Sequence, residues 1–145
     1  MIQFFTEDIS FDLSLLSVVP PWLISVASSK SFQVDNLNFI LCSDEYLLRV
    51  NQDYLQHDYY TDVITFDNSE DKHFIAADIF ISIDRVRENS SFLQTTFHNE
   101  LLRVIVHGTL HLMGFNDKTK GDKSLMTTQE NLALELYYKQ FNKDI

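Results

Sequence analysis

The sequence predicts a single α+β domain that spans residues 1–145. A length of 145 residues suits one hydrophobic core, and 45% of these residues are apolar. Only 3 glycines and 2 prolines occur, so no linker-like or low-complexity segment divides the chain. Segments of strand-like composition are mixed with segments of helical periodicity along the whole chain, which is typical of an α+β domain.

Two strands and two helices are predicted in the first part of the chain. The phenylalanine-rich segment Ile2 to Thr6 predicts a strand. Pro20-Pro21 suits the first turn of a helix that ends near Lys30, because proline is tolerated at the first helical position. Phe32 to Cys42 predicts a second strand, and Ser43 can cap the helix that follows. The apolar residues of this second helix are Tyr46, Leu47, Val50 and Tyr54.

The second part of the chain adds two strands and three helices. Asp62 to Phe66 alternates polar and apolar residues, and Phe74 to Ile83 is a longer apolar run, so both predict strands. Asp84 can cap a short helix, and a longer apolar helix is expected from Thr95 to Met113, ended by Gly114. The closing segment predicts an amphipathic helix over residues 123–141, with its apolar residues at Leu125, Leu132, Leu134, Leu136 and Tyr137.

Charge and cysteine content exclude several classes of protein. The 11 basic and 21 acidic residues give a net charge of −10, which repels phosphate, so a protein that coats nucleic acid broadly is excluded while a local basic patch stays open. Cys42 is the one cysteine and cannot form an internal disulfide, which fits a reducing cytosol. The most apolar stretch, Leu13 to Ala27, is too short and too interrupted to cross a bilayer. Glu7 and Asp8 follow the first residues, where a signal peptide would be basic and then apolar, so we expect a cytoplasmic protein with no membrane partner.

The segment from His107 to Asp117 carries the clearest chemical signal. Two histidines four residues apart on a helix share one face, so the imidazoles of His107 and His111 can reach one ion. Gly114 allows the left-handed conformation that ends the helix and turns the chain back. Asp117 follows three residues later and can offer a carboxylate oxygen as the third ligand. Two nitrogens and one oxygen leave an open corner on a tetrahedral Zn²⁺ ion, which is the arrangement of a catalytic site.

A coincidental pair of histidines is the alternative interpretation. The predicted helix is apolar nearly all round, however, and polar side chains on a buried helix are costly unless a partner such as a metal satisfies them. Gly108 stands where zinc peptidases carry a glutamate that acts as general base, so peptidase chemistry lacks its base here. A metal-activated water can still attack a phosphodiester bond. Other first-row metals also accept histidine and carboxylate, so zinc is the expected ion without being the only compatible one.

Beyond this motif, the chain resembles the YbeY family, the bacterial single-strand-specific metalloendoribonucleases of ribosomal RNA maturation. The family signature His-Gly-x-Leu-His-Leu-x-Gly, which ends in a third ligand, is matched from His107 to Asp117. Thr61 to Phe66 is similar to the family's Thr-Asp-Val-Leu-Ser-Phe strand, and Ala77 to Ser82 resembles its Gly-Asp-Ile-x-Ile-Ser strand. The further matches within residues 45–131 are Asn51, Tyr54, Asp84, Arg85, Val86, Met126 and Glu130.

The resemblance implies a zincin-like fold, with a small mixed β-sheet packed with helices and a metal site at the end of a buried helix. It also implies hydrolysis of RNA during ribosome biogenesis, with an rRNA precursor and ribosomal particles as partners. Asp117 stands where the family usually has a third histidine; zinc accepts a carboxylate, whereas Lys118 binds no metal while protonated and Asp122 is a distant reserve. Leu55 stands where many members have an arginine, which removes an expected phosphate contact.

Six further residues are candidates for an RNA contact or for support of the metal site. Glu100 lies seven residues before His107 on the same helix face and can orient a ligand, with a surface salt bridge as the alternative. His57 can supply a charge near Leu55 at low pH, although an exposed loop histidine is the favoured interpretation. The cations that can form a local RNA surface are Arg49, Arg85, Arg87 and Arg103, and for Arg85 and Arg87 pairing with Asp84 or Glu88 explains the charge equally well.

Structural roles are expected for several other residues. Asp62 and Asp78 interrupt apolar strands, where hydrogen bonding is favoured over catalysis. Tyr59 and Tyr60 can stack on unpaired bases, but packing on the core is the favoured interpretation. The histidines expected to face solvent are His73 and His98, and Cys42 is expected in the core.

The sequence therefore predicts a zinc-dependent endoribonuclease in which His107, His111 and Asp117 hold the ion. A non-catalytic, zinc-containing ribosome assembly factor is the first alternative, favoured by Leu55 and by the acidic charge. A metallopeptidase-like hydrolase is the second alternative, opposed by Gly108.

Overall fold

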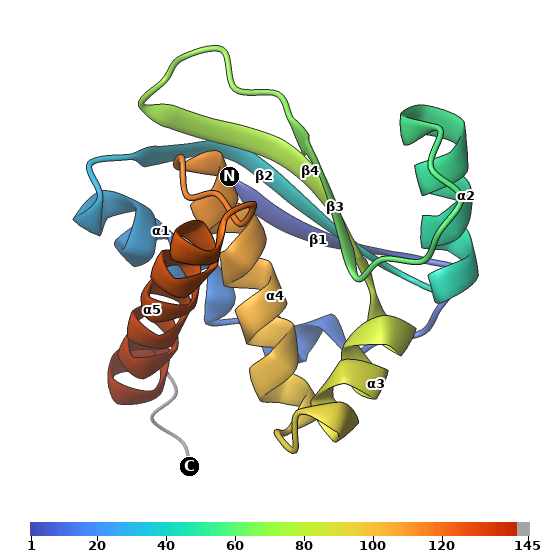
Figure 1. The fold of residues 1–145 in the computed structure, drawn as a ribbon. Helices are drawn as coiled ribbons and strands as arrows, with labels where there is room; N and C mark the ends of the chain where they lie inside the picture. The colour runs from blue at the N-terminus through green and yellow to red at the C-terminus, as the bar shows by residue number, and fades with distance from the viewer. Residues whose placement is uncertain (142–145) are drawn as a thin grey trace.

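The structure is a computed structural model that describes residues 1–141, and it contains one four-stranded sheet with helices on both faces (Figure 1). The strands are β1 (Ile2–Glu7), β2 (Gln33–Cys42), β3 (Val63–Asp67) and β4 (Phe74–Ser82). The helices are α1 (Val19–Ser29), α2 (Asp44–Leu55), α3 (Ile83–Phe92), α4 (Phe97–Leu112) and α5 (Lys120–Leu136), with short turns η1 (Leu13–Leu16) and η2 (Tyr137–Phe141). The predicted α+β class with a small mixed sheet is confirmed.

The sheet has the strand order β1-β2-β4-β3. Strands β1, β2 and β4 run parallel, whereas β3 pairs antiparallel with β4 and forms one edge. Thr65 pairs with Ile79 and Phe66 pairs with Asp78, and successive side chains of a strand point to opposite faces. Strand β3 therefore presents Thr65 to the side of α4 and Phe66 to the side of α2.

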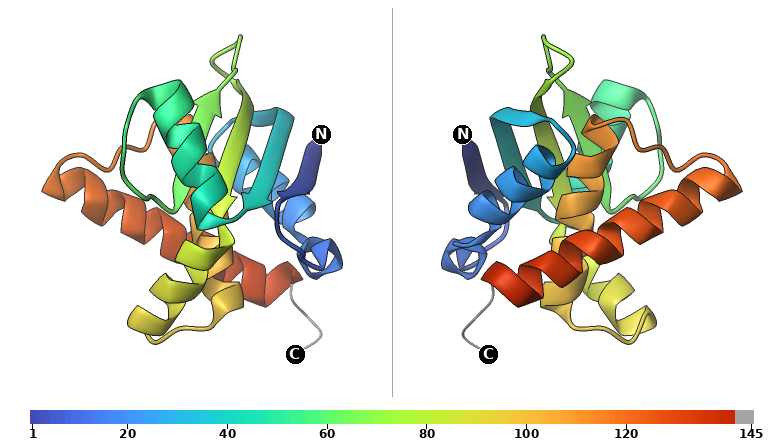
Figure 2. Two further views of the ribbon diagram at one scale, coloured as in Figure 1. Left: turned by 90° about the vertical axis from the view of Figure 1, so that its right-hand side faces the viewer. Right: turned by 90° about the vertical axis from the view of Figure 1, so that its left-hand side faces the viewer.

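The main core lies between the sheet and the helices α1, α4 and α5, as the two side views show (Figure 2). Helix α4 crosses this face, and its buried residues are Glu100, Leu101, Leu102, Val104, Ile105, Val106, Gly108, Thr109 and Leu110. Helix α2 packs on the opposite face through a smaller cluster of Cys42, Leu47, Val50 and Ile64. Cys42 is in the core as predicted, and burial raises the pKa of its thiol to about 12.

Several predicted helix ends are confirmed and one is wrong. Proline occupies the first positions of α1, and the Ser43 side chain accepts a hydrogen bond from the backbone N–H of Tyr46 at the start of α2. Gly114 has φ of 99°, the left-handed conformation expected where α4 ends. The prediction that Asp84 caps α3 is wrong, because Ser82 is the capping residue and accepts from the backbone N–H of Arg85.

The predicted apolar face of the closing helix is confirmed for Leu134 and Tyr137, which are buried, and wrong for Leu125 and Leu132. Leu125 and Leu132 are 50% and 54% exposed. The face that packs on the core is instead Met126, Glu130, Ala133, Leu134 and Tyr137. This face contains a glutamate, which a search for leucine periodicity passes over.

Two further predictions about exposure are wrong. His98 is half-buried, with Nε2 at 3.1 Å from the hydroxyl of Tyr137, whereas His73 is exposed as predicted. Tyr59 and Tyr60 are exposed rather than packed on the core. Both tyrosines make contacts at the surface instead. The hydroxyl of Tyr60 donates to Glu45, and the ring of Tyr59 stacks on His57. No helix within residues 1–141 is long and apolar enough to span a membrane.

Candidate metal centre

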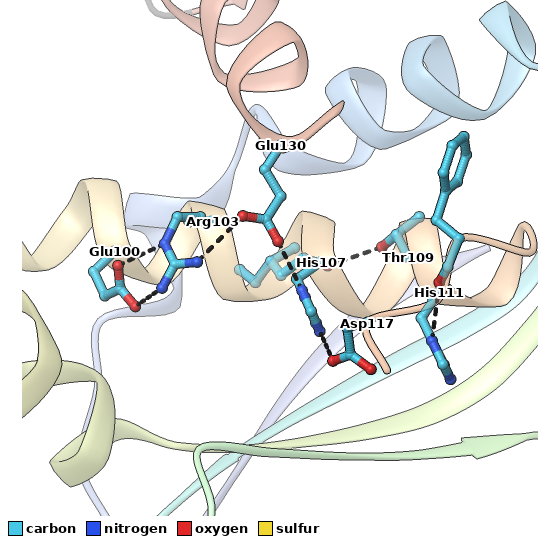
Figure 3. Close-up of polar contacts among 9 residues, drawn as sticks. Glu100, Arg103, His107, Thr109, His111, Asp117 and Glu130 are labelled. Atoms are coloured by element: carbon cyan, nitrogen blue, oxygen red, sulfur yellow. Dashed lines mark hydrogen bonds and ion pairs between the residues drawn. The ribbon is translucent and has the colours of Figure 1, made fainter. Parts of the chain in front are cut away.

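Helix α4 carries both predicted histidine ligands on one face, one turn apart (Figure 3). The Thr96 side chain caps the start of this helix by accepting from the backbone N–H of Asn99. At the other end, the backbone N–H of Gly114 donates to the carbonyl of His111, and the left-handed Gly114 turns the chain toward Asp117. The local sequence thus places two imidazoles and one carboxylate on the same side of the helix end.

His107 is held between two carboxylates. Its Nδ1 lies 2.7 Å from Oε2 of Glu130, and its Nε2 lies 3.4 Å from Oδ2 of Asp117. A carboxylate can only accept, so Nδ1 donates to Glu130, and whenever the ring is neutral its lone pair is on Nε2. The hydrogen bond with Glu130 raises the pKa of His107, and burial opposes this shift.

His111 is oriented in the same sense by the backbone. Its Nδ1 lies 3.1 Å from the carbonyl oxygen of Phe115, in the turn that follows Gly114. Because a carbonyl also only accepts, Nδ1 carries the proton and Nε2 of the neutral ring carries the lone pair. Both histidines therefore present Nε2 as the available metal ligand, with the other ring nitrogen already bonded.

Two cavities of about 220 Å³ each meet at His107 and Asp117. The residues that line the first are Asp62, Val63, Arg103, Val104, His107 and Asp117. The residues that line the second are Val63, Thr65, His107, Gly108, His111 and Asp117. The second cavity contains all three predicted ligands, and the first brings in Asp62, whose side chain was expected to have a structural role.

The three predicted ligands share a cavity without forming a preassembled site. Among residues 1–141, no three His, Cys, Asp or Glu side chains are close enough together to hold an ion as they stand. His107 and Asp117 are in contact, whereas His111 lies one helical turn further on and is exposed. The donor set nevertheless fits a zinc ion, because it offers two imidazole nitrogens with bonded partners and one carboxylate.

Behind His107, the half-buried Arg103 and the buried Glu100 and Glu130 form a chain of charges that connects α4 with α5 (Figure 3). Nε of Arg103 donates to Glu100 at 2.8 Å, and Nη1 donates to Oε1 of Glu130 at 3.2 Å. The two oxygens of Glu130 are thus divided between Arg103 and His107. Glu100 is 0% exposed, so its interpretation as a surface salt bridge is wrong; it acts on the site through Arg103.

Glu130 is the site residue that sequence reasoning missed, since it entered only as a match to a family pattern. It is buried, at 3% exposure, on the core-facing side of α5 beside Met126 and Ala133. A buried carboxylate needs a partner, and this requirement is the signal that could have identified it.

Gly108 has a packing role that adds to the argument from its missing side chain. A Cβ atom at this position would lie 3.4 Å from Cδ1 of Ile79 and 3.6 Å from Oγ1 of Thr65. Helix α4 therefore packs closely on β3 and β4 here. A methyl group fits this space in ordinary van der Waals contact with Ile79 and Thr65.

The remaining predicted residues do not gather at the cavities. Arg49 is exposed on α2 with Asp8 at 4.0 Å, and His57 stacks on Tyr59 in the loop that follows. Arg85 pairs with Asp44 at 2.8 Å and with Glu88 at 3.7 Å. The guanidinium of Arg87 lies over the Phe97 ring, and Leu55 is 40% exposed at the end of α2. Of the predicted cations, Arg103 alone lines either cavity.

Asp122 and Asp78 both have structural roles away from the three predicted ligands. The carboxylate of Asp122 accepts from the backbone N–H of Thr119 in the capping box of α5, which makes it a helix-capping group. Asp78 accepts from the amide of Asn38 at 3.0 Å on the face opposite to α4, as a structural role predicts. Lys118 is exposed next to Asp117.

The chain is similar to one family of proteins in sequence and to a solved structure in fold. A family model described as Endoribonuclease YbeY matches residues 2–138. A relative named Endoribonuclease YbeY from Cytophaga hutchinsonii is 49% identical over 135 residues, which is 93% of this chain and 94% of that protein. A relative of the same name from Parabacteroides distasonis is 44% identical over 135 residues, again 93% of this chain and 94% of that protein. The solution structure of TM1509 from Thermotoga maritima superimposes with a TM-score of 0.68 at 25% identity, covering 100% of this chain and 97% of that one.

Proposed function

This chain belongs to the YbeY family of endoribonucleases, and from the geometry of its site we propose that it hydrolyses single-stranded RNA with one Zn²⁺ ion held by His107, His111 and Asp117. The observation that carries this proposal is the orientation of His107, which has Nδ1 bonded to Glu130 and Nε2 facing Asp117. A histidine whose second ring nitrogen is hydrogen-bonded to a carboxylate is the arrangement expected of a metal ligand. Ribosomal RNA precursors in cytoplasmic ribosomal particles are the proposed substrate.

A bound zinc ion would supply a Lewis acid that lowers the pKa of water toward about 7 and stabilises charge on a phosphoryl oxygen. The residues of the protein orient the ligand His107 and balance the charges around it. Glu130 fixes the ring of His107, and Arg103 fixes Glu130 through a second hydrogen bond. Asp62 lines the same cavity as His107, and its carboxylate is the group we assign to accept a proton from the attacking water.

Leu55 in place of the family arginine lowers the positive charge that the chain can offer to a phosphate. The guanidinium of Arg103 lines the cavity, but its charge is balanced by Glu100 and Glu130. The chain thus brings little uncompensated positive charge of its own to a phosphate at this site. An ion held by His107, His111 and Asp117 would supply most of the positive charge there, so we expect RNA cleavage to require the metal.

The experiment that tests the function is cleavage of a labelled single-stranded RNA by zinc-loaded protein at low salt. His111→Ala removes one of the three ligands, and His73→Ala is the matched control because His73 is an exposed histidine outside both cavities. We expect the wild type and His73→Ala to cut the RNA, His111→Ala to be inactive, and a chelator to stop cleavage.

Other outcomes separate the alternatives. Equal cutting by the wild type and His111→Ala indicates a contaminating nuclease and contradicts the proposal. If the wild type binds one equivalent of zinc and cuts no RNA, the non-catalytic assembly factor replaces the nuclease as the best interpretation. A peptide library offered to the same samples tests the peptidase-like alternative, which lacks a general base because Gly108 has no side chain.

A further inference from the structure

A cavity of about 280 Å³ opens on the sheet face opposite to α4. One wall is a stripe of α2, because residues at a spacing of four lie above one another on a helix. The other wall is the outer face of β3 and β4. The residues that line this cavity are Tyr46, Val50, Tyr54, Phe66, Asp78 and Phe80.

The cavity is surrounded by aromatic rings in mutual contact. The ring centroids of Tyr54 and Phe66 are 6.0 Å apart, and those of Phe66 and Phe80 are 5.8 Å apart, both in edge-on geometry. Tyr46 stacks on Phe80 at 6.5 Å. Tyr54 is 72% exposed, so most of its surface is available to a ligand. Such an assembly suits a flat aromatic ligand.

The charged group at the cavity is the acceptor carboxylate of Asp78, which lines it together with Tyr46 and Tyr54. Asp78 pairs across the sheet with Phe66, and its carboxylate accepts from the amides of Asn38 at 3.0 Å and Asn68 at 3.4 Å. A carboxylate has about four acceptor positions, so two remain for a ligand. The ligand that fits is therefore a flat ring with an N–H donor on its edge for Asp78.

The cavity and the metal centre lie on opposite faces of the same edge strand. Val63 and Thr65 line the cavity with the predicted metal ligands, whereas Phe66 lines the aromatic cavity. Because β3 is at the edge of the sheet, an extended chain can pass around it from one cavity to the other without crossing a further strand.

We propose that the aromatic cavity between α2 and β3 binds an unpaired base of the RNA substrate while the scissile phosphate lies at His107. This inference rests on the proposed function. Base stacking on aromatic side chains tolerates any base. The one edge N–H of uracil lies between two carbonyl oxygens that repel the Asp78 carboxylate, so a base with an exocyclic amino group is preferred. A paired base cannot enter the cavity, so this site also favours single-stranded substrates.

The test measures RNA binding by metal-free protein, so that no cleavage occurs. A labelled single-stranded RNA is compared with a series in which one base at a time is replaced by an abasic site. For the wild type we expect one position at which base loss weakens binding about 5- to 150-fold. Tyr54→Ala weakens binding of the intact RNA by a similar factor and makes that position insensitive to base loss, whereas Tyr54→Phe retains both properties.

Phe92→Ala is the matched control, since Phe92 is an aromatic residue 86% exposed on α3 and lines neither this cavity nor the metal centre. It should bind the whole series as the wild type does. Replacing cytosine by uracil at the sensitive position should weaken binding to the wild type and have a smaller effect on Asp78→Asn. That comparison tests the hydrogen bond separately from the stacking.

The inference is overturned if base loss weakens binding at no position of the RNA. It is also overturned if Tyr54→Ala binds the intact RNA as tightly as the wild type does. A protein partner is then the better candidate for the cavity. Absence of RNA binding by the wild type overturns the inference too. A protein that cuts RNA without any dependence on Tyr54 contradicts only this inference. A protein that binds RNA through Tyr54 and never cuts contradicts only the proposed catalytic function.

Discussion

Oε2 of Glu130 lies 2.7 Å from Nδ1 of His107, so a carboxylate on α5 orients a histidine on α4 that is 23 residues earlier in the chain. The same carboxylate accepts from Arg103 through Oε1. The position of His107 therefore depends on the docking of α5 and on a charge network that extends to Glu100.

Glu130→Gln is expected to weaken zinc binding about 10- to 100-fold, because the amide keeps an acceptor but loses the charge that raises the basicity of the His107 ring. Competition with a chromogenic chelator measures the affinity. Glu135→Gln is the matched control on the same helix, since Glu135 is exposed and pairs with Lys139. Equal zinc affinity of the two variants would show that Glu130 does not support the metal centre.

Arg103→Met is expected to lower the free energy of unfolding by about 3 kcal/mol, because it leaves the carboxylate of Glu100 buried without its charge partner. Urea unfolding of the metal-free protein measures this change. Arg49→Met, which breaks an exposed 4.0 Å contact with Asp8, should cost less than about 1 kcal/mol. The double variant Glu100→Gln/Arg103→Met should recover part of the loss, since it removes both charges. Similar losses in Arg49→Met and Arg103→Met would argue against a buried network.

Gly108→Ala is expected to fold and to be up to about 1 kcal/mol more stable than the wild type, because alanine favours a helix and its Cβ would make an ordinary 3.4 Å contact with Ile79. Gly108→Glu should be about 1–3 kcal/mol less stable, because its side chain meets β3 and β4. Thermal unfolding followed by circular dichroism compares the three proteins. A Gly108→Glu variant as stable as Gly108→Ala would show that the space beside Ile79 admits a longer side chain.

The elements that local sequence determines were predictable. The Ser43 cap, the prolines that begin α1 and the left-handed Gly114 each follow from the chemistry of one or two residues. The spacing of His107, His111 and Asp117 is local in the same sense, and all three line one cavity.

The partners that come from distant parts of the chain were not predictable. The pairing of Glu130 with His107, and the place of Asp62 in the cavity, require the strand order and the docking of α5. The buried face of α5 was misjudged because hydrophobic periodicity assigns a glutamate to solvent. Here Glu130 is buried because Arg103 and His107 satisfy it.

His98 gives a pH dependence of stability that can be isolated from the metal centre. Its ring is half-buried against the hydroxyl of Tyr137, and burial lowers its pKa. In the unfolded chain the pKa returns to about 6.5, so below that value the unfolded state binds a proton that the native state does not. The contribution of neutral His98 is therefore complete above about pH 6.5 and is lost as the pH falls toward the lowered pKa.

His98→Gln keeps a hydrogen-bonding side chain and removes this titration. Between about pH 7.5 and about pH 5, the free energy of unfolding should fall more for the metal-free wild type than for His98→Gln. Urea unfolding at several pH values measures the difference. His73→Gln should follow the wild type, because His73 is exposed. If His98→Gln loses as much stability as the wild type over this range, the His98 ring titrates alike in the folded and unfolded states, and its contact with Tyr137 does not depend on the neutral ring.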